Sequence, residues 1–322
     1  MTDRAPFVLC PGQGAQSVGM GKAWYDASAA AREIFARADE AMGDSLGAPL
    51  STLCFEGPAD TLNRTDVSQP AIFATGLACW AGLRERGMPM PAATAGLSLG
   101  EYTALVVAGA IGFEDGLRLV ALRGQAMQEA AESVPSGMVA LIGADEASAT
   151  ALCEQAAEGE TLVVANLNAP GQVVISGTKA ACERAEAAAG SHNLRATPLG
   201  VAGAFHSPIM APAAARLRAA LEQTPIKAPV CACYSNVTAG MHEAGGSGSI
   251  EQSIRDRLFE QLTNPVRWAE SMVAASERFP VPGVQWIELA PGRALTGMMR
   301  RIARQTKVES YDTPPDAPSP SE

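Results

Sequence analysis

The chain has 322 residues, 47% of them hydrophobic and 18% charged, which is enough to bury one large core or two unequal ones. A net charge of −10 and an aromatic content of 5% argue against a nucleic-acid partner, which needs a basic surface or aromatic stacking. The seven cysteines follow no disulfide framework, and no signal peptide or membrane-spanning run is visible, so we expect a cytoplasmic protein.

Short apolar runs that favour strands alternate along the chain with longer segments of helical periodicity. The predicted strands cover residues 7–10, 92–97, 138–142, 162–165, 173–176, 195–199, 230–234 and 284–289. The predicted helices cover residues 28–42, 71–86, 114–132, 146–158, 179–189, 208–223, 250–262 and 294–304. Such alternation is typical of an α/β fold with a mostly parallel sheet.

One part of this alternation indicates a second, smaller domain. From about Gly137 to Gly200 the predicted order is β-α-β-β-α-β, which is typical of a ferredoxin-like unit. We therefore expect a large domain formed by residues 1–132 and 201–312, with a ferredoxin-like insert at residues 133–200. Residues 313–322 are rich in proline, serine and acidic side chains and are expected to form a disordered tail.

A serine between two glycines, in Gly96-Leu97-Ser98-Leu99-Gly100, follows an apolar run and precedes a helix-like segment. This Gly-x-Ser-x-Gly pattern is typical of a nucleophile elbow, where a tight strand-to-helix turn exposes the hydroxyl and offers backbone N–H groups to an oxyanion. The pattern also arises by chance, with the serine acting only as a helix cap. A serine nucleophile needs a base, which must come from elsewhere in the chain.

The chain contains three histidines as candidate bases. His192 and His242 fall in polar or glycine-rich connections and are expected to be solvated. His206 is followed by Ser207 and Pro208, which are typical of a helix N-cap and first helical position. The helix dipole there disfavours a charged imidazole, so we predict that His206 stays neutral and accepts a proton at physiological pH. A purely structural histidine fits the same pattern.

Three further features of the sequence indicate a binding or metal site less specifically. The loop Pro-Gly-Gln-Gly-Ala-Gln at residues 11–16 could wrap around an anion or a carbonyl group, but Ser17 replaces the third glycine of a dinucleotide-binding motif. Arg123 lies on an otherwise apolar helix face, where its planar fork could bind a carboxylate or simply extend into water. Cys231 and Cys233 have no further ligands at zinc spacing, so core packing is favoured over a metal site.

Eight motifs follow one another along the chain: the loop at 11–16, Gln-Pro-Ala at 69–71, the serine motif at 96–102, Arg-Gly at 123–124, the asparagine-containing segment 166–172, Gly-Ala-Phe-His at 203–206, the segment 261–266 and Gly-Arg-Ala-Leu at 292–295. Taken in this order, they resemble the malonyl-CoA:acyl carrier protein transacylase family of bacterial type II fatty acid synthesis. The resemblance runs from about Phe7 to Arg304, which is nearly the whole chain.

The resemblance implies an α/β-hydrolase-like large domain and a ping-pong acyl transfer. Ser98 would attack the thioester of malonyl-CoA with His206 as general base, and the malonyl-serine would pass its acyl group to the phosphopantetheine thiol of acyl carrier protein. Backbone N–H groups of Gln13 and Leu99 would form the oxyanion hole, and Arg123 would hold the free malonyl carboxylate. The other substrate-binding residues that the resemblance implies are Gln261, Met127, Phe205 and Asn168. In this family a backbone carbonyl from the segment of Gln261 also orients the histidine.

The family usually has histidine directly before the nucleophile, and this chain has Leu97. We expect this difference to affect the selectivity for the acyl group and not the activity. Phe205 resembles the malonyl-selecting version of related acyltransferases, in which a bulky ring leaves no space for an α-methyl branch. We also expect a monomer without metal, bound cofactor or membrane contact. A docking surface for the acidic carrier is expected, and the densest basic candidates are Arg293, Arg300, Arg301 and Arg304.

Other classes of function remain open on the sequence alone. A serine hydrolase or thioesterase would use the same elbow and base but release its acyl group to water. A stand-alone polyketide-type acyltransferase would differ in acyl selectivity. A non-catalytic protein that binds CoA esters could keep the pocket, but the retention of both Ser98 and His206 speaks against it.

Overall fold

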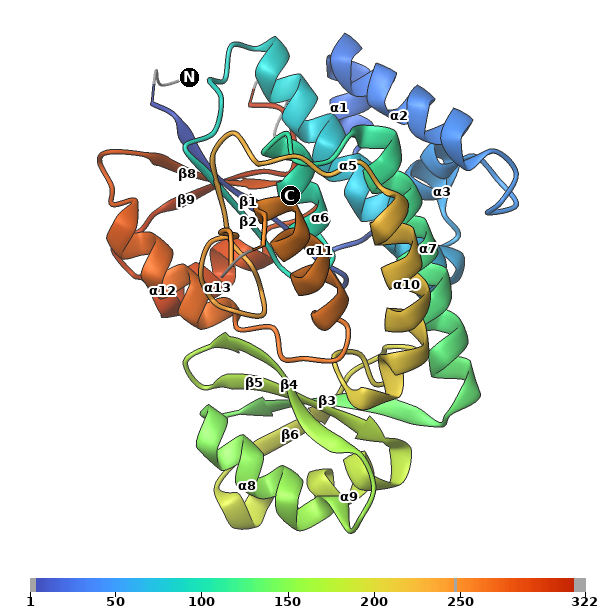
Figure 1. Cartoon of the computed structure of the whole chain (residues 1–322), viewed down its shortest axis with the longest axis vertical. Helices are drawn as coiled ribbons and strands as arrows, with labels where there is room; N and C mark the ends of the chain where they lie inside the picture. Colours follow the sequence, from blue (N-terminus) through green and yellow to red (C-terminus); the bar gives the residue numbers. More distant parts are fainter. Residues whose placement is uncertain (1–3, 246–247, 316–322) are drawn as a thin grey trace, which may run out of the picture.

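The computed structural model describes residues 4–245 and 248–315. Its larger unit is built on a five-stranded sheet in the order β7-β2-β1-β8-β9, in which every neighbouring pair is parallel. The strands are β1 (Pro6–Cys10), β2 (Ala93–Gly96), β7 (Ala232–Cys233), β8 (Gln285–Leu289) and β9 (Val308–Tyr311). Parallel neighbours need crossover connections, which helices supply here (Figure 1). The predicted α/β fold with a parallel sheet is confirmed.

Helices cover both faces of this sheet, because side chains of a strand alternate between its faces. In β1, Val8 and Cys10 pack into one core, while Phe7 and Leu9 pack into another on the opposite face. The second face is covered by α12 (Trp268–Arg278) and α13 (Ala294–Ile302). The first core is closed by α1 (Lys22–Ala27), α2 (Ala29–Met42), α3 (Leu50–Glu56), α4 (Ala59–Leu62), α5 (Thr65–Glu85), α6 (Gly100–Val107), α7 (Phe113–Ser133), the 3-10 turn η2 (Pro208–Met210), α10 (Ala211–Gln223) and α11 (Ile250–Glu260).

The smaller unit follows the predicted order β-α-β-β-α-β and forms an antiparallel sheet in the order β4-β5-β3-β6. Its elements are β3 (Ser136–Ile142), α8 (Glu146–Ala157), β4 (Leu162–Ala169), β5 (Gln172–Thr178), α9 (Lys179–Ala188), the turn η1 (Ala189–His192) and β6 (Arg195–Pro198). Val139 and Ile175 pack with α8 and α9, whereas Met138 and Val174 on the other face join the core of the larger unit. The sheet therefore lies between its own helices and the larger unit (Figure 1).

The structure departs from the predicted elements where burial overrides the local pattern. Helix α5 begins at Thr65 and continues through Pro70, because this stretch is buried and the packing offsets the hydrogen bond lost at proline. The predicted strand at 230–234 shrinks to β7, since Val230 is 70% exposed. The elements α1, α3, α4, α12 and β9 lie where none was predicted.

The predicted disordered tail at residues 313–322 is described only for its first three residues. Pro314 is buried, whereas Thr313 and Pro315 are exposed. Residues 316–322 lie outside the described residues.

Candidate active site

Ser98 lies in the tight turn between β2 and α6, with its backbone in the left-handed region at a φ of 50°. The flanking glycines are required sterically. A Cβ on Gly96 would lie 1.9 Å from the Gly100 carbonyl, and one on Gly100 would lie 2.1 Å from the carbonyl oxygen of Cys10. The glycine spacing therefore allows the turn that presents Ser98 at the carboxyl end of a central strand.

The hydroxyl of Ser98 is paired with His206, which is 108 residues away in the sequence. Ser98 Oγ lies 2.8 Å from His206 Nε2, and His206 Nδ1 lies 2.8 Å from the backbone carbonyl oxygen of Gln261. Since a carbonyl oxygen only accepts, Nδ1 carries the proton and Nε2 of the neutral ring is free to accept one from the serine. Ser207 caps the turn η2 with its side chain, as predicted.

Burial sets the charge state of this histidine. His206 is 4% exposed, and burial lowers its pKa to about 4; the Arg123 guanidinium acts in the same direction, and the Gln261 carbonyl opposes it. The direction agrees with the neutral imidazole expected from the sequence. The cause is different, because desolvation and a neighbouring cation act here rather than the helix dipole. A neutral imidazole at physiological pH can act as a general base.

Arg123 lies directly behind the nucleophile on α7 and is 1% exposed. Its Nη2 donates to Ser98 Oγ and to Gln261 Oε1, both at 3.0 Å, and its Nη1 donates to Gln69 Oε1 at 2.7 Å. Burial lowers its pKa. Within the described residues the guanidinium forms no ion pair with a carboxylate. A buried cation with neutral hydrogen-bond partners is stabilised by an incoming anion.

The side-chain amide of Gln261 connects Arg123 with the Ser98 backbone and with Glu101. Its Nε2 donates to the Ser98 carbonyl oxygen at 3.0 Å and to Glu101 Oε2 at 2.6 Å, while its Oε1 accepts from Arg123. Its side chain is fully buried. Neither Gln261 nor Arg123 belongs to the wall of the cavity in front of Ser98, so both reach this cavity through their contacts with the serine.

A cavity of about 430 Å³ opens in front of Ser98 and His206, between the larger unit and the insert. Its wall includes most of the side chains that the sequence singled out, together with Met138 and Val174 of the insert. These predicted residues are Gln13, Leu97, Met127, Asn168 and Phe205. The candidate site is therefore a cleft between two units, with the hydrogen-bonded Ser98 and His206 in its wall.

Two backbone N–H groups, one in the loop after β1 and one in the serine turn, are the predicted donors of an oxyanion hole. The N–H groups of Gln13 and Leu99 donate to no acceptor within residues 4–245 and 248–315. Gln13 follows Gly12, and a Cβ on Gly12 would lie 2.3 Å from the carbonyl oxygen of Leu97. The glycine thus allows the loop after β1 to approach the serine turn closely.

The structure also contains site residues that the sequence reasoning missed. Asn236 Oδ1 accepts the Ser98 N–H at 2.6 Å, and Asn236 Nδ2 donates to the Gly96 carbonyl oxygen at 2.7 Å. Gln69, which accepts a hydrogen bond from Arg123, was part of a sequence motif but was given no role. Glu101 likewise belonged to the serine motif without a predicted role. The signal that could have pointed to Glu101 is one acidic residue in the otherwise uncharged segment that follows the elbow.

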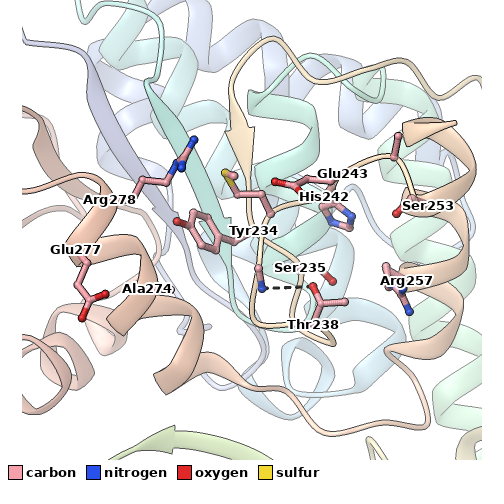
Figure 2. Close-up of a pocket in the computed structure, with 14 residues that line it drawn as sticks. Tyr234, Ser235, Thr238, His242, Glu243, Ser253, Arg257, Ala274, Glu277 and Arg278 are labelled. Carbon is pink, nitrogen blue, oxygen red and sulfur yellow. Dashed lines mark hydrogen bonds between the residues drawn. The ribbon is translucent and has the colours of Figure 1, made fainter.

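The prediction for His242 was wrong. It was expected to be solvated, but it is 4% exposed and its Nε2 lies 2.8 Å from Glu101 Oε1. His242 also contributes to the wall of a second cavity, of about 800 Å³, with Tyr234, Ser253 and Arg257 (Figure 2). That cavity contains neither Ser98 nor His206 in its wall, so its size does not make it the candidate site.

Outside the cleft, the four arginines proposed as a carrier-docking patch are exposed at or beside α13, and none forms an ion pair within the described residues. They are Arg293, Arg300, Arg301 and Arg304. In the described part of the chain, no cluster of histidine, cysteine or acidic side chains is arranged to hold a metal ion. No helix within residues 4–245 and 248–315 combines the length and apolar character needed to cross a membrane.

Comparison with known proteins agrees with this geometry. The chain matches the acyl transferase domain family over residues 7–314. It is 41% identical over 306 residues to the malonyl CoA-acyl carrier protein transacylase of Salmonella typhimurium, covering 94% of both proteins. The solved malonyl CoA-acyl carrier protein transacylase of Coxiella burnetii has a TM-score of 0.88 and 35% identity, covering 96% of this chain and 94% of that one.

A further structural relative is a malonyl-transacylase solved in complex with a type II polyketide acyl carrier protein. Its TM-score is 0.86 at 38% identity, and the match covers 96% of each chain. The α/β fold and the match over nearly the whole chain define an acyl transferase domain. Within that family, the chain belongs to the malonyl CoA-acyl carrier protein transacylases, which confirms the resemblance found in its motifs.

Proposed function

We propose that this enzyme transfers malonyl from malonyl-CoA to the phosphopantetheine thiol of acyl carrier protein through a malonyl-serine intermediate. The observation that carries the proposal is the buried Arg123 guanidinium, 3.0 Å from Ser98 Oγ and surrounded by neutral partners. In malonyl a single methylene separates the carboxylate from the thioester carbon. A cation adjacent to the nucleophile therefore fits this acyl group and gives no advantage to acetyl.

In the first half-reaction His206 Nε2 takes the proton of Ser98 as Oγ bonds to the thioester carbon. The carbonyl oxygen becomes an oxyanion, which the free N–H groups of Gln13 and Leu99 stabilise. When the tetrahedral intermediate collapses, the carbon–sulfur bond breaks and His206 returns the proton to the CoA thiolate. Arg123 exchanges its bond to Ser98 Oγ for the malonyl carboxylate.

In the second half-reaction the phosphopantetheine thiol of the carrier takes the place of CoA. His206 removes the thiol proton, sulfur attacks the ester carbon, and Ser98 leaves with the proton restored to Oγ. The relative solved with a carrier protein supports such an acceptor. The exposed arginines around α13 supply positive charge for an acidic carrier on a protein whose net charge is −10.

The remaining side chains of the cleft select and hold the substrate. Phe205 and Met127 are 5% and 2% exposed and form an apolar wall beside His206, which disfavours a branched acyl group. Asn168 Oδ1 is buried without a hydrogen-bond partner in the described residues and lies at the same cavity, so it can accept an amide N–H of the pantetheine arm. Gln261 contributes indirectly, through Arg123 and His206.

We also propose the finer classification and setting. The larger unit is α/β-hydrolase-like, and the strand order β4-β5-β3-β6 with both helices on one face supports a ferredoxin-like insert at residues 133–200. Seven unpaired thiols support a reducing cytoplasm. The monomer expected from the sequence is part of the same proposal.

Intact-mass measurement tests the intermediate. After mixing with malonyl-CoA, the protein should carry a malonyl adduct that holo acyl carrier protein removes and that persists without it. Ser98→Ala should abolish the adduct, and His206→Ala should slow its formation by about a hundredfold or more. An adduct formed at the normal rate on Ser98→Ala would refute the mechanism. An adduct that water removes as fast as the carrier does would instead indicate a hydrolase.

A further inference from the structure

Behind the nucleophile, four buried side chains form one hydrogen-bonded chain in the order Arg123, Gln261, Glu101 and His242. Arg123 Nη2 donates to Gln261 Oε1 at 3.0 Å, Gln261 Nε2 donates to Glu101 Oε2 at 2.6 Å, and Glu101 Oε1 lies 2.8 Å from His242 Nε2. Their exposures are 1%, 0%, 0% and 4%, so water does not compete for these bonds.

The Glu101 carboxylate determines which way the Gln261 amide points. In the observed orientation the amide nitrogen faces two acceptors, Glu101 Oε2 and the Ser98 carbonyl oxygen, and the amide oxygen faces the Arg123 donor. Rotating the amide by half a turn would set donor against donor at Arg123 and acceptor against acceptor at the other two contacts. In a buried site each such mismatch leaves polar groups without partners.

His242 in turn holds Glu101. The glutamate extends from the first turn of α6, where a helix N-terminus favours an anion, and its Oε2 also accepts the Asn236 N–H at 3.2 Å. His242 Nδ1 is buried and has no partner in the described residues. An unpaired lone pair costs less there than an unpaired N–H would, so Nε2 carries the proton and donates to Glu101. The histidine approaches from the wall of the second cavity (Figure 2).

We propose that Glu101 and His242 form a positioning pair that locks the Gln261 amide and so holds the Arg123 guanidinium in place for the carboxylate of the acyl group. The inference rests on the proposed role of Arg123 in malonyl transfer. Neither side chain lines the catalytic cavity, and within the described residues neither bonds to Ser98 Oγ as Arg123 does, so both act through Gln261 and not on the substrate. Loss of the pair should therefore weaken transfer of acidic acyl groups more than transfer of neutral ones.

A matched pair of amide substitutions at His242 tests this. The amide nitrogen of glutamine occupies about the position of His Nε2, so His242→Gln retains a donor to Glu101, whereas the shorter asparagine reaches only the Nδ1 position. We expect His242→Asn to lower the ratio of malonyl to acetyl acylation rates by about tenfold and His242→Gln to change it by less than about threefold. His192→Asn is the control and should leave the ratio unchanged, because His192 lies on the insert with its Nε2 2.8 Å from Gln155 Oε1.

A double-mutant cycle separates positioning from general packing. In an Arg123→Ala background, His242→Asn should alter malonyl acylation by less than about threefold, because the residue it positions is gone. Equal losses for malonyl and acetyl in His242→Asn, or the same loss with and without Arg123, would overturn the proposal. If His242→Asn does not fold, Glu101→Asp, which keeps the charge but withdraws it from Gln261, is measured in the same way. Failure of the wild-type enzyme to take up malonyl would instead refute the proposed function.

Discussion

Replacement of Arg123 by alanine tests whether this residue selects malonyl over uncharged acyl groups. The guanidinium is 1% exposed and bonded to Gln69, Gln261 and Ser98 Oγ. Its removal takes away a buried cation and one bond to Ser98 Oγ, but it leaves Ser98 and His206 themselves in the chain. Malonyl then loses the counter-charge of its carboxylate. Acetyl has no carboxylate and loses only the indirect support that Arg123 gives to Ser98.

The magnitude follows from the cost of leaving one member of a buried charge pair alone, about 2–5 kcal/mol. With a factor of ten for each 1.36 kcal/mol, malonyl acylation should fall by about 30- to 5,000-fold. The hydrogen bond from Arg123 to Ser98 Oγ affects both substrates, and its loss should slow acetyl acylation by about tenfold or less. The ratio of the two rates therefore reports the carboxylate contact alone.

The assay is the single-turnover rate of adduct formation with malonyl-CoA and with acetyl-CoA, followed by intact mass. Arg123→Lys keeps the charge but loses the planar fork, so it should fall between wild type and alanine. Arg118→Ala is the matched control, because this arginine lies on the same helix, is exposed, and pairs with Asp115. If malonyl and acetyl rates fall by the same factor in Arg123→Ala, the arginine is structural and the carboxylate argument fails.

Three other predictions follow from the site. Since burial lowers the pKa of His206 to about 4, its neutral form persists at lower pH than in a free histidine; reaction of Ser98 with an uncharged sulfonyl fluoride should stay constant down to about pH 5 and fall near pH 4, and a midpoint near 6.5 would contradict this. Arg300→Glu with Arg301→Glu should raise KM for the carrier while acylation by malonyl-CoA is unaffected; an unchanged carrier KM at low salt would discard the patch. Leu97→His should change malonyl kcat/KM by less than about tenfold, or ~1.4 kcal/mol, because the apolar side chain of Leu97 lines the cavity but can neither accept the serine proton nor bind the carboxylate; a loss of several hundredfold in a folded variant would show that the pocket depends on leucine.

Local sequence was sufficient to predict the serine turn and the alternation of strands and helices. The Ser98 turn depends on glycines two residues to either side, because any Cβ there would collide with neighbouring backbone, and this constraint is written in a five-residue pattern. Likewise the strands of a sheet covered on both faces appear as short apolar runs, and helices appear by their periodicity. The helix α5 shows the limit, since the predicted helix begins at residue 71, whereas buried packing extends it back through Pro70 to Thr65.

The contacts behind Ser98 and the charge state of His206 were decided by tertiary structure. Glu101 meets His242 across 141 residues and the Asn236 backbone across 135, and no local pattern relates these positions. The neutral state of His206 was predicted from a neighbouring helix end, yet its main cause is burial by distant segments. His192 and His242 both occur in polar connections, but one bonds to exposed Gln155 and the other is enclosed against α6. Desolvation depends on which elements pack around a side chain, and that is settled only when the whole chain has folded.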